Sequence, residues 1–221
     1  HYSVVSPDCR LVVWSPIVED ELTSDIFGAD DSGSEPLESS KNEVIQEKVE
    51  FASIFIQDVE TEKIIRTLPI SSSEVSVEKF SPDGRLLAIA FFDANASKLT
   101  VQLIDLQSGI VSLEIPNLDR QHYSPDQVFF SRDGSTLALL TTGQNAAGED
   151  QPMISTWNVK RGKQIAKWSV GADRMVWNLT FSADGRQIIG GIEFESDELE
   201  PSQPEVRVWE TTTGRTVASW I

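Results

Sequence analysis

The stretch Phe80-Ser81-Pro82-Asp83-Gly84, followed after Arg85 by the apolar run Leu86 to Phe92, is the most informative part of this 221-residue chain for its architecture. Proline presets φ, aspartate hydrogen-bonds back to the backbone and glycine takes a positive φ, so Pro-Asp-Gly predicts a tight turn between antiparallel strands. The phrase recurs in related form, each time before an apolar run. Its four copies begin at Val5, Phe80, Phe130 and Phe181.

A second phrase follows each copy and precedes another alternating apolar stretch. One example runs from Thr156-Trp157-Asn158 to Gly162, and the four copies end at Glu62, Gly109, Gly162 and Gly214. Six residues beyond these ends stand Leu68, Ile115, Trp168 and Trp220. The constant register predicts four consecutive units, each of four short antiparallel strands (a, b, c and d) joined by hairpins. No stretch has a sustained helical period, so we predict an all-β chain.

These units resemble the blades of WD-repeat β-propellers, in the Phe-Ser-Pro-Asp-Gly turn and in the turns that follow Trp157 and Trp209. The resemblance covers essentially the whole chain and implies one partial propeller, residues 1–221, with blades at 1–70, 71–115, 116–170 and 171–221. The family's Gly-His dipeptide is absent and its Trp-Asp pair is eroded, as in Trp157-Asn158, so its buried Asp-His-Ser-Trp network cannot form. Other bacterial propellers with looser signatures remain an alternative.

The resemblance also implies a ring of six to eight blades, whereas four units are visible here. The chain begins with histidine rather than methionine, which is typical of a fragment or a processed product. Because open sheet edges associate, we expect either further blades outside this chain or edge-to-edge self-association of two copies.

Three irregular stretches interrupt the repeat, at 17–50, 143–152 and 193–205, and each lies between strands b and c. They hold 19 of the 35 acidic residues and 2 of the 18 basic ones, so the net charge of −17 falls within them. Loops between b and c share one face of a propeller, which predicts an acidic face. We weigh three interpretations: solvated loops, a surface for a basic protein partner, and a calcium site at Asp30-Asp31-Ser32-Gly33-Ser34-Glu35, whose spacing does not match a calcium loop.

Composition excludes several classes of function. The net charge argues against nucleic acid and anionic membranes as partners, since proteins bind phosphate groups through clustered lysine and arginine side chains. One cysteine and two histidines exclude a disulfide framework and a three-histidine metal site, and no phosphate loop, dinucleotide fingerprint or nucleophile elbow is present. We therefore expect no catalytic residue, no cofactor and no metal. The compartment stays open, with the cytoplasm slightly favoured.

Cys9 stands where the other turns carry Gly84, Gly134 and Gly185. A side chain is disfavoured at positive φ, so this position predicts a strained or altered turn.

Trp177 breaks the pattern of repeated tryptophans, since its counterparts are Ser76 and Asp126. It lies near the start of strand a of the fourth unit, close to the acidic face. Such an aromatic either anchors an interface or packs under the 193–205 insertion. With Asp173 and Arg174 it forms our candidate partner-binding site in a non-catalytic protein-interaction scaffold. The alternative is an accessory segment of a larger hydrolase, kinase or quinone-dependent oxidoreductase.

Overall fold

The computed structural model describes residues 2–15, 52–70, 74–93, 98–118, 128–172, 174–194 and 204–221. Within these ranges every regular element is a β-strand, and the sixteen strands form four antiparallel four-stranded sheets. The all-β fold of four consecutive units is thereby confirmed. The first sheet comprises β1 (Tyr2–Val5), β2 (Leu11–Ser15), β3 (Ala52–Asp58) and β4 (Ile64–Ile70).

The remaining sheets repeat this plan. The second comprises β5 (Glu74–Phe80), β6 (Leu86–Asp93), β7 (Lys98–Asp105) and β8 (Val111–Leu118). The third comprises β9 (Val128–Phe130), β10 (Thr136–Gln144), β11 (Asp150–Asn158) and β12 (Lys163–Ser169). The fourth comprises β13 (Arg174–Phe181), β14 (Gln187–Phe194), β15 (Glu205–Glu210) and β16 (Thr216–Trp220). The repeat spacing places the end of the second blade at residue 115. Strand β8 continues beyond that residue, and Leu118 still pairs with Leu99.

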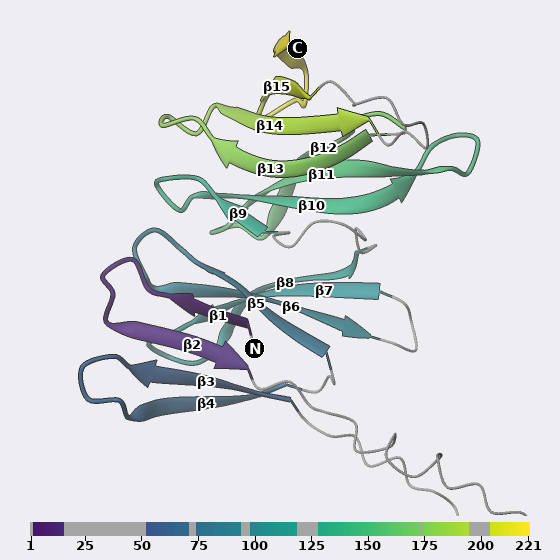
Figure 1. Ribbon diagram of the computed structural model, residues 1–221. Coiled ribbons are helices and arrows are strands. Elements are labelled where there is room, and N and C mark those ends of the chain that lie inside the picture. Colours follow the sequence, from purple (N-terminus) through teal and green to yellow (C-terminus); the bar gives the residue numbers. More distant parts are fainter. Residues whose placement is uncertain are drawn as a thin grey trace, which may run out of the picture.

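The four sheets stack face to face in sequence order (Figure 1). Within each sheet the strands follow the order of the chain, so hairpins alone connect them. Three layers of buried aliphatic side chains separate the sheets. Representative residues are Val13, Ile54 and Ile89 in the first layer, Val101, Leu103 and Leu139 in the second, and Leu140, Ile154 and Ile188 in the third.

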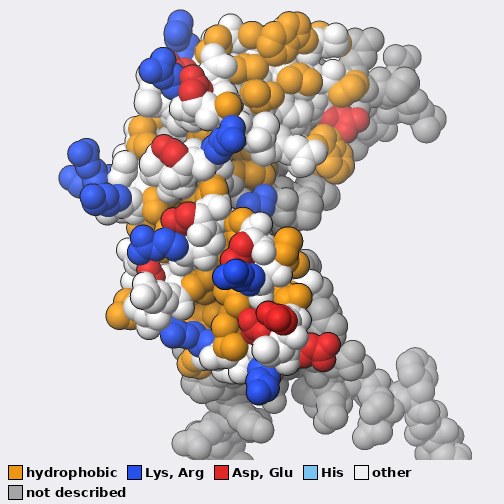
Figure 2. Space-filling model, turned by 90° about the vertical axis from the view of Figure 1, so that its left-hand side faces the viewer, with side chains coloured by type: hydrophobic (Ala, Val, Ile, Leu, Met, Phe, Trp, Pro, Cys, Tyr) orange, Lys and Arg blue, Asp and Glu red, His pale blue; other side chains and the backbone are white. Residues whose placement is uncertain are grey.

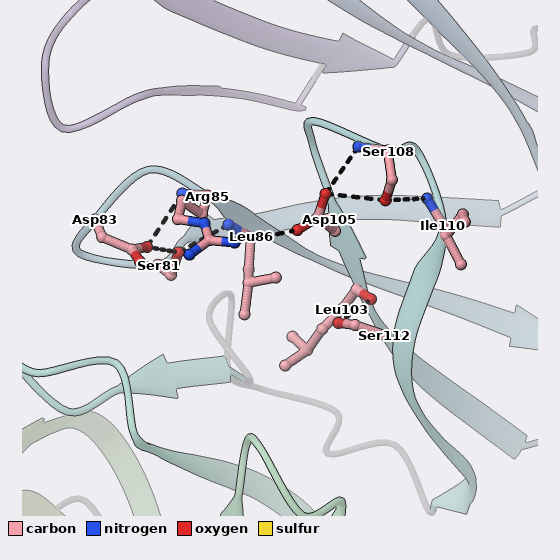
Figure 3. Close-up of polar contacts among 9 residues, drawn as sticks. All are labelled: Ser81, Asp83, Arg85, Leu86, Leu103, Asp105, Ser108, Ile110 and Ser112. Atoms are coloured by element: carbon pink, nitrogen blue, oxygen red, sulfur yellow. Dashed lines mark hydrogen bonds and ion pairs between the residues drawn. The ribbon is translucent and has the colours of Figure 1, made fainter.

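The turns between strands a and b share one hydrogen-bonding pattern. The buried Ser81 hydroxyl donates to Asp83 Oδ1 at 2.6 Å and accepts from the Leu86 backbone N–H at 2.9 Å (Figure 3). Asp83 Oδ1 also accepts from the Arg85 N–H at 3.1 Å. The Ser81 hydrogen bond, above all, holds the pKa of Asp83 below its ordinary value of 3.8. Equivalent pairs are Ser6–Asp8, Ser131–Asp133 and Ser182–Asp184.

The turns between strands c and d lie beside the a–b turns. Asp105 accepts from the Ser108 N–H at 2.8 Å (Figure 3). The Leu106 N–H donates to the Arg85 carbonyl at 2.9 Å, which ties the two turns together. These turns form one face of the molecule, where basic and acidic side chains are interspersed (Figure 2).

The turn at Cys9 adopts the same backbone as its glycine counterparts, with φ at 58°. The predicted strain is therefore present, because the turn keeps its geometry and the cysteine accepts a positive φ. Glu62 is the other non-glycine residue with positive φ in the described ranges, at 57°, and both lie in the first sheet.

The expected insertions differ in nature. The prediction that 143–152 is irregular was wrong. This stretch is an extended hairpin in which Gly143 pairs with Gln151 and Gln144 pairs with Asp150. Asn145 closes its turn by accepting the N–H groups of Ala147 and Glu149. All of 17–50, including the candidate calcium segment, and residues 195–203 lie outside the described residues. The described part contains no helix with the length and hydrophobicity needed to cross a membrane.

Candidate functional site

The candidate site lies on the fourth sheet, where β13 and β14 run side by side. Their ladder shifts between Val176 and Asn178, so Trp177 is the extra residue of a β-bulge. A bulge re-aims the side chain that it carries. Trp177 is 46% exposed, and its indole Nε1–H donates to Glu193 Oε2 at 2.6 Å. The indole is thus held in a fixed orientation while close to half of it remains accessible.

Arg174 occupies the first position of β13 and is mostly buried. Its Nη1 lies 2.7 Å from Oε2 of Glu205, the first residue of β15. Arg207 binds the same carboxylate through Nε at 2.7 Å and Nη2 at 2.8 Å, and its Nη1 donates to the Val170 carbonyl at 3.0 Å. Bidentate pairing of this kind is geometrically specific. Arg174 therefore contributes to a buried ion cluster that fixes the ends of β13 and β15.

Glu205 is the centre of this cluster and is 8% exposed. The hydrogen bond from Arg207 is the main reason that its pKa lies below the ordinary value of 4.5, with Arg174 adding to the effect and burial opposing it. A carboxylate with a lowered pKa is a poor general base near neutral pH. The cluster is therefore suited to holding structure and to recognition.

The structure describes two of the three predicted site residues, and each has a partner of its own, Glu193 for Trp177 and Glu205 for Arg174. Trp177 and Arg174 lie on β13, whereas Asp173 lies outside the described residues. Sequence reasoning missed Glu193, Glu205 and Arg207. The alternation in Glu205-Val206-Arg207 places both charged residues on one face of a strand and was the available signal.

Two acidic residues counted with the 193–205 insertion are therefore not loop residues. Glu193 lies in β14 and accepts the Trp177 indole, and Glu205 lies in β15 between two arginines. The expectation that the whole net charge belongs to loops is corrected at these positions, because strand pairing and hydrogen bonds fix both carboxylates. Among the described residues no group of three or more His, Cys, Asp or Glu side chains could hold a metal ion.

Comparison with solved structures gives the architecture. Hydrazine synthase from Kuenenia stuttgartiensis matches with a TM-score of 0.54 and 15% identity over 95% of this chain and 50% of that chain. The β-propeller domain of the Trilobed protease from Pyrococcus furiosus matches with a TM-score of 0.50 and 13% identity over 76% of this chain and 48% of that chain. The fold is that of a β-propeller.

A third similar structure is the acylaminoacyl peptidase of Pyrococcus horikoshii, with a TM-score of 0.53 and 10% identity over 76% of this chain. The propeller described here spans between 28% and 50% of the length of these solved chains. No family model matches the sequence, and no curated protein matches it.

Proposed function

We propose that this propeller segment is a non-catalytic scaffold that binds a protein partner around Trp177. The observation that carries the proposal is the half-exposed indole on a β-bulge, oriented by Glu193 and standing on a strand that the Arg174–Glu205 ion pair anchors. Aromatic side chains that are rigid before binding lose little conformational entropy in a complex, which is why tryptophan is frequent among energetically dominant interface residues.

A partner with a basic surface fits this site. The indole face attracts arginine and lysine side chains, and the carboxylate of Glu193 adds negative charge beside the indole. Such pairing accelerates association at low salt and weakens as ionic strength rises. A partner that binds through phosphate groups is disfavoured on the same grounds.

Replacement of Trp177 tests the proposal. The chain is immobilised, its interaction partner is isolated and identified, and the affinity of the purified pair is measured by calorimetry at two salt concentrations. Trp177→Ala should weaken binding by about 1–3 kcal/mol, as expected for an interface hot spot. Ile110→Ala is the control, because it removes an exposed hydrophobic side chain from the second sheet, far from the fourth sheet in sequence. An affinity that Trp177→Ala leaves unchanged contradicts the proposal.

We also propose that the blades are degenerate repeats of the WD type. Support comes from the four Ser-x-Asp turns and from Trp209, which stands at the position of the family's strand-c tryptophan and is 1% exposed. Natural relatives of this chain should restore the Gly-His or Trp-Asp signatures at the corresponding positions, and a set of relatives that lacks both would contradict the proposal.

The second candidate function is an accessory propeller segment of a larger enzyme. It is favoured by the similarity to propellers of a protease, a peptidase and hydrazine synthase, of which this chain spans at most half the length. Sequencing the complete reading frame tests it. A catalytic domain beside residues 1–221 would support this candidate, and a reading frame without one would exclude it.

A further inference from the structure

The outer face of the fourth sheet, the side turned away from the third sheet, is apolar and uncovered in the described chain. Hydrophobic side chains gather over this end of the stack (Figure 2). Val206 in β15 is 44% exposed and Trp220 in β16 is 58% exposed. Both residues belong to the same cross-strand row, since Val206 pairs with Trp220 and with Gly191.

The third sheet shows what such a row does when it is covered. There Ile154 pairs with Trp168 and with Leu140, so this row is the counterpart of Val206, Trp220 and Gly191. Ile154 and Leu140 are fully buried against the fourth sheet. At two of its three positions, Val206 and Trp220, the row in the fourth sheet thus repeats the residue types of an interface that is already formed one sheet earlier in the chain.

Trp168 has a defined seat on the next sheet. It lies on Gly214, which ends the c–d turn of the fourth sheet with φ at 71°. A Cβ atom added to Gly214 would lie 2.6 Å from Cε3 of Trp168, a distance that real Cβ atoms do not tolerate. The tryptophan therefore requires glycine at the end of the turn that it covers.

The two earlier interfaces use a related arrangement, in which the covering residue stands four residues after its own c–d turn instead of six. The side chain of Leu113 lies on Gly162, with Cδ1 at 3.2 Å from an added Cβ, and the side chain of Arg66 lies on Gly109, with Cζ at 3.3 Å. In all three interfaces a residue of strand d covers the glycine that ends the c–d turn of the following sheet. Trp220 stands at the register of Trp168, six residues after its own turn glycine.

We propose that the outer face of the β13–β16 sheet is the seat of a fifth blade of the same propeller, with Trp220 lying on a glycine that ends the c–d turn of that blade. The occupant must carry glycine with positive φ at this position and an aliphatic side chain opposite Val206. This inference does not depend on the binding role proposed for Trp177, which lies on the bulge of β13.

A second copy of the described chain does not offer this seat. Its first sheet, the one with an uncovered outer side, ends the c–d turn with Glu62 at φ 57°, and a side chain there would occupy the space that Trp220 needs. The turn glycines of the other three sheets are already covered by Arg66, Leu113 and Trp168. The same first sheet has Cys9 in place of the a–b turn glycine. Its outer side therefore lacks the c–d turn glycine that a residue of the preceding blade covers in the other three sheets.

The test supplies a blade of the required kind. A fusion in which a second copy of residues 170–221 follows Ile221 keeps the register, because Ile221 corresponds to Ser169, and provides a fresh Gly214 turn. The chain is labelled with 5-fluorotryptophan, and Trp220→Phe assigns the fluorine resonance. The solvent isotope shift of Trp220 between water and deuterium oxide should fall at least twofold in the fusion, toward the value of Trp168. Gly214→Glu in the appended copy should restore it.

Two results overturn the proposal. The first is an isotope shift of Trp220 that stays unchanged in a fusion whose circular dichroism shows the added strands. The second is equal protection of Trp220 whether the appended turn carries glycine or glutamate.

Two measurements on the unfused chain need no added blade. Gly214→Glu should raise the isotope shift of Trp168. An unchanged value would show that the tryptophan does not require glycine at the end of the turn that it covers, and would overturn the proposal. Sedimentation should give the same oligomeric state for the parent chain and for Trp220→Ala. A dimer lost on Trp220→Ala would show that a second copy occupies the face and would overturn the proposal.

Discussion

At Cys9 and Glu62 the backbone adopts φ near 58° with an L side chain in place. The left-handed region costs such a residue about 1–2 kcal/mol, because Cβ approaches the following carbonyl oxygen. In the other turns glycine avoids this cost, as Gly84 does at φ 71°. The first sheet thus carries backbone strain that the others lack, at the two turn positions that face outward from the stack.

Cys9→Gly should raise the free energy of unfolding by about 0.5–1 kcal/mol. Relief of the strain outweighs the entropy that glycine adds to the unfolded chain, which costs about 0.4–1 kcal/mol. Urea denaturation measures the change. Gly84→Ala is the matched reverse substitution and should destabilise the protein by a similar amount. Loss of stability in Cys9→Gly would show that the thiol makes a compensating contact.

On the scale of elements, the Ser-x-Asp turn fixes each a–b hairpin through one buried hydroxyl. Ser81 and Ser131 are each 1% exposed, and their hydroxyl oxygens accept the first N–H of the following strand. The aspartate two residues later accepts hydrogen bonds from this hydroxyl and from a backbone N–H. Each turn therefore satisfies its own buried polar groups.

Ser81→Ala should lower the free energy of unfolding by about 1–3 kcal/mol, because it leaves the partly buried Leu86 N–H without its acceptor. Ser112→Ala is the control, since the exposed Ser112 only donates to the Leu103 carbonyl and supports no buried N–H (Figure 3). Thermal or urea denaturation of the two variants provides the comparison. Equal losses would contradict the role assigned to Ser81.

The turns also predict how stability depends on pH. The pKa values of Asp83 and Asp133 lie below the ordinary 3.8, chiefly because of the hydrogen bonds from Ser81 and Ser131. A pKa lowered in the folded state gives a stabilisation that is complete above the unfolded value and is lost as pH falls through the folded value. The unfolding midpoint should thus decline below about pH 4. Asp83→Asn should be less stable than the parent at pH 6, and the difference should shrink at pH 3.

The repeated phrases predicted the hairpins because turn chemistry and apolar alternation are local properties of sequence. The register of Trp168 and Trp220 was visible for the same reason. The extended hairpin around Gly143 was missed because solvated strand ends are held by backbone hydrogen bonds and lose the period of two. The bulge at Trp177 and the pairing of Glu205 with Arg174 depend on residues distant in sequence, which a single sequence does not connect.

On the scale of the whole molecule, each sheet is held by its immediate neighbours. A buried hydrogen bond crosses the third layer, where Thr156 Oγ1 donates to the Thr211 carbonyl at 3.0 Å. In such a stack, stability is close to a sum of contributions from sheets and nearest-neighbour interfaces. Damage to one interface should therefore remain local.

Thr156→Val tests this. It keeps the shape of the side chain but removes the donor to Thr211, and it should cost about 1–2 kcal/mol at the interface of the third and fourth sheets. Native-state hydrogen exchange should show faster opening in β11 and β15, with β2 and β3 unaffected. A uniform loss of protection over all four sheets would show that the stack unfolds as one cooperative unit.

The difference between Glu62 and the three turn glycines makes the blades unequal as genetic building blocks. A tandem duplication of the fourth repeat would place Trp220 over a glycine and leave the stack continuous. Duplication of residues 1–70 behind residue 221 would place the same tryptophan over a glutamate side chain. If Trp220 requires glycine beneath it, a duplicated repeat can follow the fourth one only when its c–d turn ends in glycine. The residue that ends this turn would therefore determine which repeats can be added after residue 221.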